Sequence, residues 1–185
     1  MMTDKTRQFP KPFFLPYVIL GYNAVYPQVF NPRVILRNDL VTKGLIDQMD
    51  GSREGKDVDA WLQQAMNIPP DQHPVPRNIM EETWVQQNLD DNTYQQSDAG
   101  KILADNNLWS GWAPNMEMLI QHSYYDDCVP YANSEKAYNE FIKTDPTSKN
   151  RLSFWYIPII NWPQLNHVQA AVVAIPIAIT WFGDK

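Results

Sequence analysis

An aspartate and a histidine in the last third of the chain have the residue types and the spacing of an acid–base pair. Asp126 closely follows the short apolar run Met118-Leu-Ile120, and His167 comes about 40 residues later, ahead of a long apolar tail. A histidine whose ring is oriented by a carboxylate can take the proton from a hydroxyl nucleophile, which is the chemistry of ester hydrolysis. Asp126 and His167 are therefore the candidate catalytic residues.

The elements around this pair are predicted from the apolar pattern. The runs 116–121 and 152–160 are typical of buried strands, while 134–143 and 168–182 have the pattern of helices. A β-α-β-α order favours a parallel strand pair with helical crossovers. Because parallel sheets are normally built from more than two strands, we expect further strands outside this sequence.

The preceding part of the chain shows a different pattern, with helical spacing and no alternation typical of strands. We predict an irregular lead-in over 1–13, a helical region over 14–110 and an α/β region over 111–185. Within the helical region the predicted helices are 15–26, 39–49 with Asp39 as its N-cap, 57–66, 78–88 and 97–108.

Two segments carry a resemblance to a known family. Asp126-Asp-Cys-Val-Pro130, followed by a predicted helix, resembles the acid loop of α/β-hydrolases, which typically reads G-x-x-D-x-x-V-P. Asn166-His167 and the helix after it resemble the histidine loop and final helix of the same family, in the triad order Ser…Asp…His. The resemblance is to the lipase and esterase branch and covers about residues 112–182.

This resemblance implies a fold class and an activity. The fold would be α/β: the C-terminal portion of an α/β-hydrolase fold, with few parallel strands and crossover helices, preceded by an all-helical cap or lid. The activity would be hydrolysis of carboxylic esters, with Asp126 orienting the ring of His167 and His167 acting as general base. The serine nucleophile and the oxyanion hole would belong to an N-terminal half, so that this chain alone is expected to be inert.

The sequence departs from the family pattern in three ways. It contains no Gly-x-Ser-x-Gly elbow, and Ser110, in Trp-Ser-Gly-Trp, lacks the leading glycine and follows no predicted strand. Ser123 stands where a glycine is common. The neighbouring Asp127 is an alternative to Asp126 as the acid, although the spacing to the Val-Pro pair favours Asp126.

Other residues could carry different chemistry. His122, Asp126, Asp127 and Cys128 offer metal-ligand atoms, but their spacing matches no standard zinc pattern, so no metal or cofactor is predicted. Cys128 could act as a nucleophile with His167, but it follows the acid rather than occupying an elbow.

Composition excludes some partners. The net charge is −6 and the basic residues are scattered, which argues against nucleic-acid binding. The longest apolar run, 170–179, is too short to span a bilayer, and the polar start of the chain does not read as a signal peptide. The sequence assigns no cellular compartment.

A second function class is also open. The chain could be a non-catalytic, hydrolase-derived module that binds a protein partner or an apolar ligand. In either case we expect association, with the N-terminal half of a hydrolase as a second polypeptide or with another copy of this chain, because an incomplete sheet leaves a strand edge and apolar faces uncovered.

Overall fold

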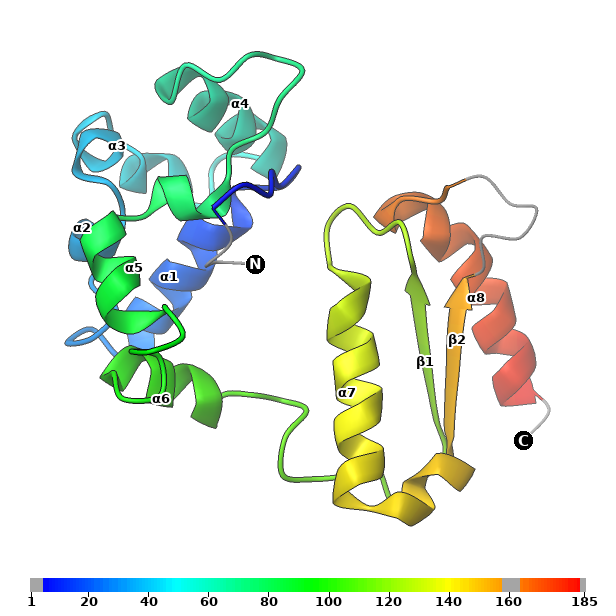
Figure 1. The fold of residues 1–185 in the computed structure, drawn as a ribbon. Coiled ribbons are helices and arrows are strands. Elements are labelled where there is room, and N and C mark those ends of the chain that lie inside the picture. Colours follow the sequence, from blue (N-terminus) through cyan, green and yellow to red (C-terminus); the bar gives the residue numbers. More distant parts are fainter. Residues whose placement is uncertain (1–4, 158–163, 184–185) are drawn as a thin grey trace. The chain divides into compact units, whose positions relative to one another are not determined.

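A computed structural model describes residues 5–157 and 164–183 of the chain, shown in Figure 1. The chain divides into two compact units, Met1–Asn106 and Asn107–Lys185. Each unit has its own secondary structure and is described by itself.

The first unit consists of short helices joined by turns. Over its described residues no strand ladder forms, and the single β contact is an isolated antiparallel bridge between Leu36 and Met80. The prediction of helix and loop for this region is confirmed. The helices are α1 (Phe14–Val25), α2 (Pro32–Ile35), α3 (Asn38–Thr42), the 3₁₀ turn η1 (Ile46–Met49), α4 (Gly55–Ala65), the 3₁₀ turn η2 (Pro76–Ile79), α5 (Glu82–Asn88) and α6 (Asp98–Asp105).

A single apolar cluster holds these helices together. The side chains at its centre are fully buried and come from elements far apart in the sequence, among them Ile35, Leu40, Leu62, Ile79 and Val85. None of the contributing helices exceeds 12 residues, a length at which isolated helices are marginal in water. The cluster, rather than helix propensity, therefore stabilises the unit.

The prediction of one continuous helix over 39–49 is wrong, because the structure has two separate elements there, α3 and η1. Gly44 has φ +94°, a left-handed conformation that ends α3 before η1 begins. Asp39 is not the N-cap, because α3 begins at Asn38 with Arg37 at the cap position. Asp39 instead accepts two hydrogen bonds from the Arg37 guanidinium, at 2.8 and 2.7 Å.

The second unit has the predicted β-α-β-α order. Strand β1 (Met118–Ser123) leads to α7 (Tyr131–Thr144), and the 3₁₀ turn η3 (Pro146–Asn150) leads to β2 (Leu152–Ile157) and then α8 (His167–Gly183). The strands are parallel, with Met118 opposite Leu152 and Ser123 opposite Ile157. Strand β1 begins and ends two residues later than predicted, and the predicted residues 158–160 of the second strand lie outside the described residues.

The two-stranded sheet lies between α7 and α8 (Figure 1). Phe141 of α7 and Ala170 of α8 are buried, as is Leu152 at the start of β2. A helix-rich chain with a small parallel sheet is compatible with part of an α/β fold. Among the described residues, no helix is both long and apolar enough to cross a membrane.

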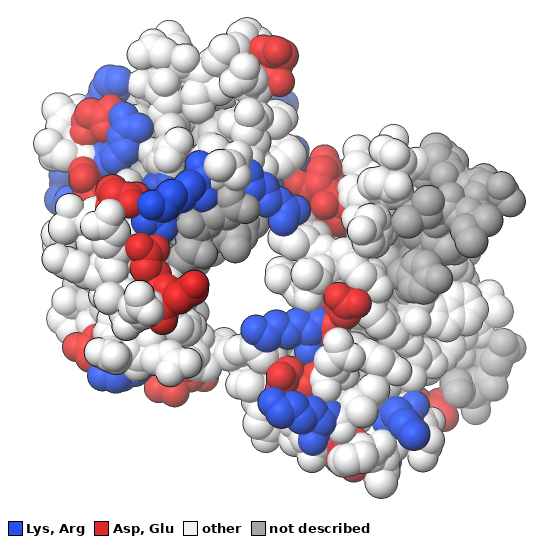
Figure 2. Space-filling model, in the orientation of Figure 1, with Lys and Arg blue, Asp and Glu red and all other residues white. Residues whose placement is uncertain are grey.

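Charged side chains of both signs are interspersed over the surface drawn in Figure 2. Several form ion pairs, and Arg77 has the most buried side chain among the arginines and lysines of these pairs. Its side chain is only 2% exposed and contacts the carboxylates of Glu82 and Asp90, at 2.7 and 2.8 Å. This arginine joins η2, α5 and the turn after α5.

Candidate active site

The parallel arrangement brings the two candidate residues together. Asp126 lies in the loop after β1, and His167 is the first residue of α8, which follows the loop after β2. The carboxyl ends of parallel strands meet at the same edge of a sheet. There, Nδ1 of His167 lies 2.7 Å from Oδ2 of Asp126. The prediction that these two side chains lie within hydrogen-bond distance is confirmed.

The loop itself holds the Asp126 carboxylate in place. Its Oδ1 accepts hydrogen bonds from the backbone N–H groups of Cys128, at 2.8 Å, and Val129, at 2.7 Å. The side chain is 6% exposed. Burial raises the pKa of the Asp126 carboxyl, but the hydrogen bonds from Val129, from the His167 ring and from Cys128 together hold that pKa below its usual value.

This ionised carboxylate determines the state of the histidine ring. A carboxylate can only accept hydrogen bonds, so the proton of a neutral His167 lies on Nδ1. The other ring nitrogen, Nε2, then carries a lone pair. The His167 side chain is 50% exposed, so this lone pair is open to a molecule approaching from outside the unit.

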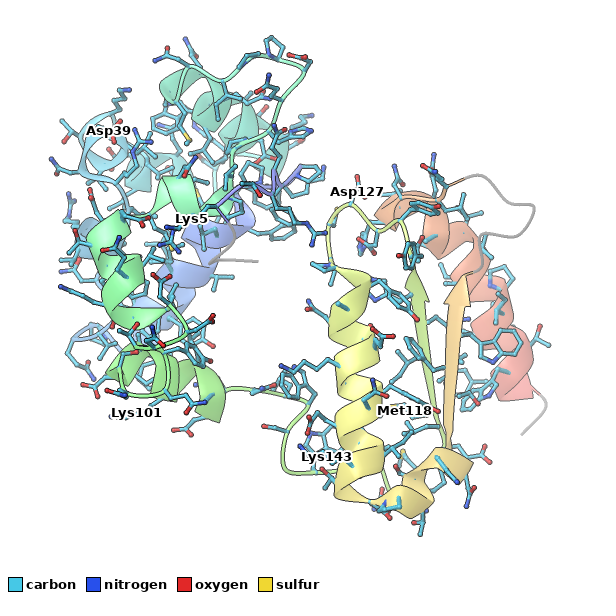
Figure 3. All side chains as sticks on the ribbon, viewed as in Figure 1. Lys5, Asp39, Lys101, Met118, Asp127 and Lys143 are labelled. Atoms are coloured by element: carbon cyan, nitrogen blue, oxygen red, sulfur yellow. The ribbon has the colours of Figure 1, made fainter. Side chains whose placement is uncertain are left out.

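Asp127 has a different role from its neighbour. Its Oδ1 accepts a hydrogen bond from the backbone N–H of His167, at 3.0 Å, and does not contact the ring. Figure 3 shows Asp127 in the loop between β1 and α7, close to the start of α8. A carboxylate is favourable at a helix N-terminus because it pairs with unsatisfied N–H groups there.

The start of α8 is further fixed by a reciprocal cap. Oδ1 of Asn166 accepts from the backbone N–H of Gln169 at 3.0 Å, and Oε1 of Gln169 accepts from the backbone N–H of Asn166 at 3.2 Å. This is the arrangement of a capping box, built here from an asparagine and a glutamine. Because His167 directly follows Asn166, at the first helical position, the cap fixes the backbone from which its side chain extends.

Ser123, the residue in the position where a glycine is common, links the two loops. Its hydroxyl donates a hydrogen bond to the Leu165 carbonyl, at 2.6 Å. The bond ties the end of β1 to the segment just before His167. A glycine could not make this bond, so the departure from the family pattern supports the site rather than disrupting it.

His122, which the sequence indicates only as a possible metal ligand, is a neighbour of Asp126. Its Nε2 lies 2.9 Å from the Val129 carbonyl oxygen, which can only accept, so the proton of the neutral ring lies on Nε2. Its Nδ1 then accepts from the Ser134 hydroxyl, at 2.6 Å. The same Nε2 is 3.4 Å from Oδ2 of Asp126. The apolar run before Asp126 gave no signal for this contact.

A cavity of about 270 Å³ lies beside the pair. Its lining combines the polar residues Gln121, Asp126 and His167 with alanines of α8 at 170, 171 and 174. The amide nitrogen of Gln121 is buried and has no hydrogen-bond partner among the described residues.

The remaining candidates are placed as follows. Ser110 lies near the start of the second unit, and its hydroxyl donates to the Asn107 carbonyl at 3.5 Å. The Cys128 thiol contacts Oδ1 of Asp127 at 3.8 Å. Asp126, Cys128 and His167 together offer ligand atoms that could hold a metal ion.

A family model described as secretory lipase matches residues 76–185, which is more than half of the chain. Comparisons with curated proteins and with solved structures found no match. The matched residues include Asp126, His167 and the whole of the second unit. The resemblance to lipases read from the sequence is thereby confirmed, and the chain belongs to the secretory lipase family, a family of lipase-like hydrolases.

Proposed function

We propose that Asp126 and His167 are the acid and the general base of a serine hydrolase that acts on carboxylic esters. The observation that carries the proposal is the 2.7 Å hydrogen bond between Nδ1 of His167 and Oδ2 of Asp126, in a chain of the secretory lipase family. The order of the two residues, each after a parallel strand, is that of an α/β-hydrolase triad.

The chemistry follows from the protonation states. Nε2 of His167 accepts the proton of a serine hydroxyl while the serine oxygen attacks the ester carbonyl. The imidazolium that forms is stabilised by the ionised Asp126. It then donates the proton to the leaving alcohol, and the same base activates water to release the acid. The depressed pKa of Asp126 supports this role, because the carboxylate stays ionised throughout.

In this proposal the serine and the oxyanion-hole donors come from another polypeptide segment. The sequence has no Gly-x-Ser-x-Gly motif, and the serine nearest to the pair in the chain, Ser123, donates its hydroxyl to Leu165. We further propose that residues 14–110 act as the cap over the substrate and 111–185 as part of the core. The first of these roles rests on the helical character of the unit alone.

A graft tests the proposal. Residues 76–185 replace the corresponding segment of an active secretory lipase, and hydrolysis of p-nitrophenyl butyrate is measured. We expect activity that is lost with His167→Ala and strongly reduced with Asp126→Asn, on the order of the 10⁴-fold effect of removing a triad acid. Asp127→Asn is the matched control and should retain most of the activity. Equal losses from both asparagine variants would refute the assignment of Asp126.

The full chain provides a second test that does not depend on a graft. In ¹⁵N NMR, the neutral form of the His167 ring should show a protonated Nδ1 and an unprotonated Nε2. Asp126→Asn should disturb this tautomer preference, while Asp127→Asn should not. A ring protonated on Nε2 in the native chain would contradict the proposed base.

The second candidate function is that of a non-catalytic module that binds a protein partner, and the surface of the second unit favours it. Helix α8 exposes a stripe of apolar side chains spaced alternately four and three residues apart, at Val168, Val172, Ile175, Ile179 and Phe182. Among the described residues β1 pairs only with β2, which leaves its other edge open. Covering several hundred Å² of such surface is worth on the order of 10 kcal/mol, similar to the stability of a domain.

We therefore expect this chain to associate, with a serine-bearing hydrolase segment or with a second copy. Analytical ultracentrifugation at micromolar concentration measures this directly. Val172→Glu places a charge in the middle of the stripe and should shift the population towards monomer. A folded monomer with a cooperative melt in the unaltered chain would contradict the association.

A further inference from the structure

Three side chains with different ligand atoms meet between the loop after β1 and the start of α8. They are the Asp126 carboxylate, the Cys128 thiol and the His167 imidazole, and their ligand atoms all lie within 4.8 Å of one another. Two come from the loop after β1 and one from the start of α8. Because the third is about 40 residues away in the chain, no linear spacing pattern could indicate the set.

The set has the size of a tetrahedral site. Zinc bonds of about 2.0–2.3 Å to oxygen, nitrogen and sulfur imply that ligand atoms lie about 3.5 Å apart. The oxygen–nitrogen distance of 2.7 Å must therefore lengthen by somewhat less than 1 Å, and the sulfur, which lies within 4.8 Å of the other ligand atoms, must approach them by at most about 1.3 Å. The Cys128 side chain is half-buried and that of His167 is half exposed, so we expect rotation of these two side chains to provide the change.

We propose that Asp126, Cys128 and His167 form a binding site for Zn²⁺ or a similar thiophilic divalent cation. One sulfur, one nitrogen and one oxygen ligand suit zinc, whereas magnesium and calcium take oxygen ligands. The thiolate and the carboxylate balance the two charges of the ion. The carboxylate of Asp127, 3.8 Å from the sulfur, adds a further negative charge next to the site.

Three protein ligands leave one coordination position for water, which is the arrangement of an open zinc site. The cavity of about 270 Å³ beside Asp126 and His167 provides room for that water and a route for the ion. On binding, the thiol proton is released to solvent. If Nδ1 of His167 takes the metal, its proton is replaced by one on Nε2 through exchange with solvent.

The ion and the proposed base compete for the same ring. With zinc on Nδ1, the neutral ring carries its proton on Nε2 and has no lone pair left to accept another, and with zinc on Nε2 the lone pair is occupied. Zinc would thus inhibit the hydrolase. This consequence rests on the proposed function, whereas the binding itself does not, so the two are tested separately.

Binding is tested on the full chain with Cd²⁺ as a spectroscopic probe, followed by displacement with Zn²⁺. We expect an ultraviolet thiolate-to-metal absorption band that saturates at one equivalent. Cys128→Ser should abolish the band. His167→Ala and Asp126→Asn should each weaken cadmium binding by more than about tenfold, because losing a ligand costs at least as much as losing an outer-shell partner.

His73→Ala is the matched control. His73 lies in the first unit, where its backbone N–H donates to Gln8, and its ring takes no part in the proposed site. This variant should bind cadmium as the unaltered chain does. Saturation of the His167→Ala and Asp126→Asn variants at the same concentration as the unaltered chain would reduce the site to a single thiol and overturn the proposal.

A second measurement covers the case in which a variant fails to fold. Co²⁺ added to the unaltered chain should give the intense visible bands of tetrahedral cobalt together with a thiolate band, and the His167 ring signals should shift in NMR. Weak bands typical of octahedral cobalt, or unshifted His167 signals, would overturn the proposal without any variant. In the grafted lipase, zinc should inhibit ester hydrolysis, and Cys128→Ser should relieve this inhibition. Inhibition that persists in Cys128→Ser would refute inhibition through this site and would leave the catalytic assignment of Asp126 and His167 intact.

Discussion

Gly100, in α6, has no room for a side chain. A Cβ atom at this position would lie 2.6 Å from the Tyr94 carbonyl carbon and closer still to its oxygen, and 3.0 Å from Oγ of Ser97. Real Cβ atoms do not approach other atoms so closely. Two of the three atoms are backbone, so the conflict cannot be relieved by rotating a flexible side chain, and the turn 94–97 must move.

The cost of Gly100→Ala can be worked out from these contacts. Overpacking costs about 1–3 kcal/mol. The Ser97 hydroxyl is the N-cap of α6 and accepts from the backbone N–H of Gly100 at 2.9 Å, so displacing it costs about a further 1 kcal/mol. The higher helix propensity of alanine returns about 0.5–1 kcal/mol. These terms sum to about 1–3.5 kcal/mol, and because the closest contacts are to backbone atoms we expect a net destabilisation in the upper part of this range, about 2–3 kcal/mol.

Gly21→Ala is the matched control. Gly21 lies inside α1, and a Cβ atom there would meet nothing within 4 Å. The same substitution should therefore stabilise the chain by about 0.5–1 kcal/mol, because only the propensity term remains. The two substitutions are chemically identical and are expected to have opposite signs.

Thermal melting followed by circular dichroism, with urea unfolding as the second measurement, checks both predictions. For a unit of about 100 residues, 1 kcal/mol corresponds to roughly 4–8 °C, so Gly100→Ala should lower the melting temperature by about 10 °C or more. A Gly100→Ala variant that melts within about 2 °C of the unaltered chain would refute the reasoning. So would a loss of stability in Gly21→Ala similar to that in Gly100→Ala.

Two further predictions concern charges in the first unit. Burial raises the pKa of Asp59 to about 6 although its carboxylate accepts the Phe13 N–H. The contribution of this group to stability is therefore complete below about pH 4 and is lost as the pH rises through about 6. Asp59→Asn should remove that loss of stability, which we expect to be on the order of 1 kcal/mol for a partly exposed carboxyl. Urea unfolding at pH 4 and 7 measures it, and an equal loss of stability between these pH values in the unaltered chain and in Asp59→Asn would contradict the prediction. Arg77→Met should cost roughly 1.5–3 kcal/mol, whereas Arg37→Met, which breaks an equally short but exposed pair, should cost less than about 1 kcal/mol. Similar urea midpoints for the two methionine variants would show that burial does not decide the difference.

Much of the second unit could be predicted because its signals are local. The apolar runs, the Pro130 before α7 and the order of elements are enough to predict a parallel pair. In such a pair, residues that follow successive strands lie at the same edge. The order of elements in the sequence therefore predicts that Asp126 and His167 lie close together.

The choice between Asp126 and Asp127 could not be made by topology, since both follow the same strand. It depends on which carboxylate the turn directs towards the ring. Oδ1 of Asp126 is held by two backbone N–H groups, which leaves Oδ2 for the ring, while Asp127 reaches the backbone of His167. Such contacts depend on loop geometry that residue types alone do not determine.

The errors in the first unit have a similar cause. The apolar spacing over 39–49 fits a continuous helix, but Gly44 adopts a left-handed conformation that residue counting cannot detect. The predicted helix over 78–88 is also divided, because Met80 is extended where it bridges to Leu36. In both cases a tertiary contact or a single backbone angle overrides the local pattern.

The orientation of His167 is determined by contacts within the second unit. Its backbone N–H is held by Asp127, its ring by Asp126, and the segment just before it by the Ser123 hydroxyl on Leu165. Each of these bonds joins the end of β1 or the loop after it to residues 165–167 at the start of α8, so the proposed acid and base are positioned together when the two strands pair. In the proposed hydrolase, a serine-bearing segment therefore need not orient the histidine. It has only to bring a hydroxyl within reach of Nε2, and the half-exposed ring leaves that approach open.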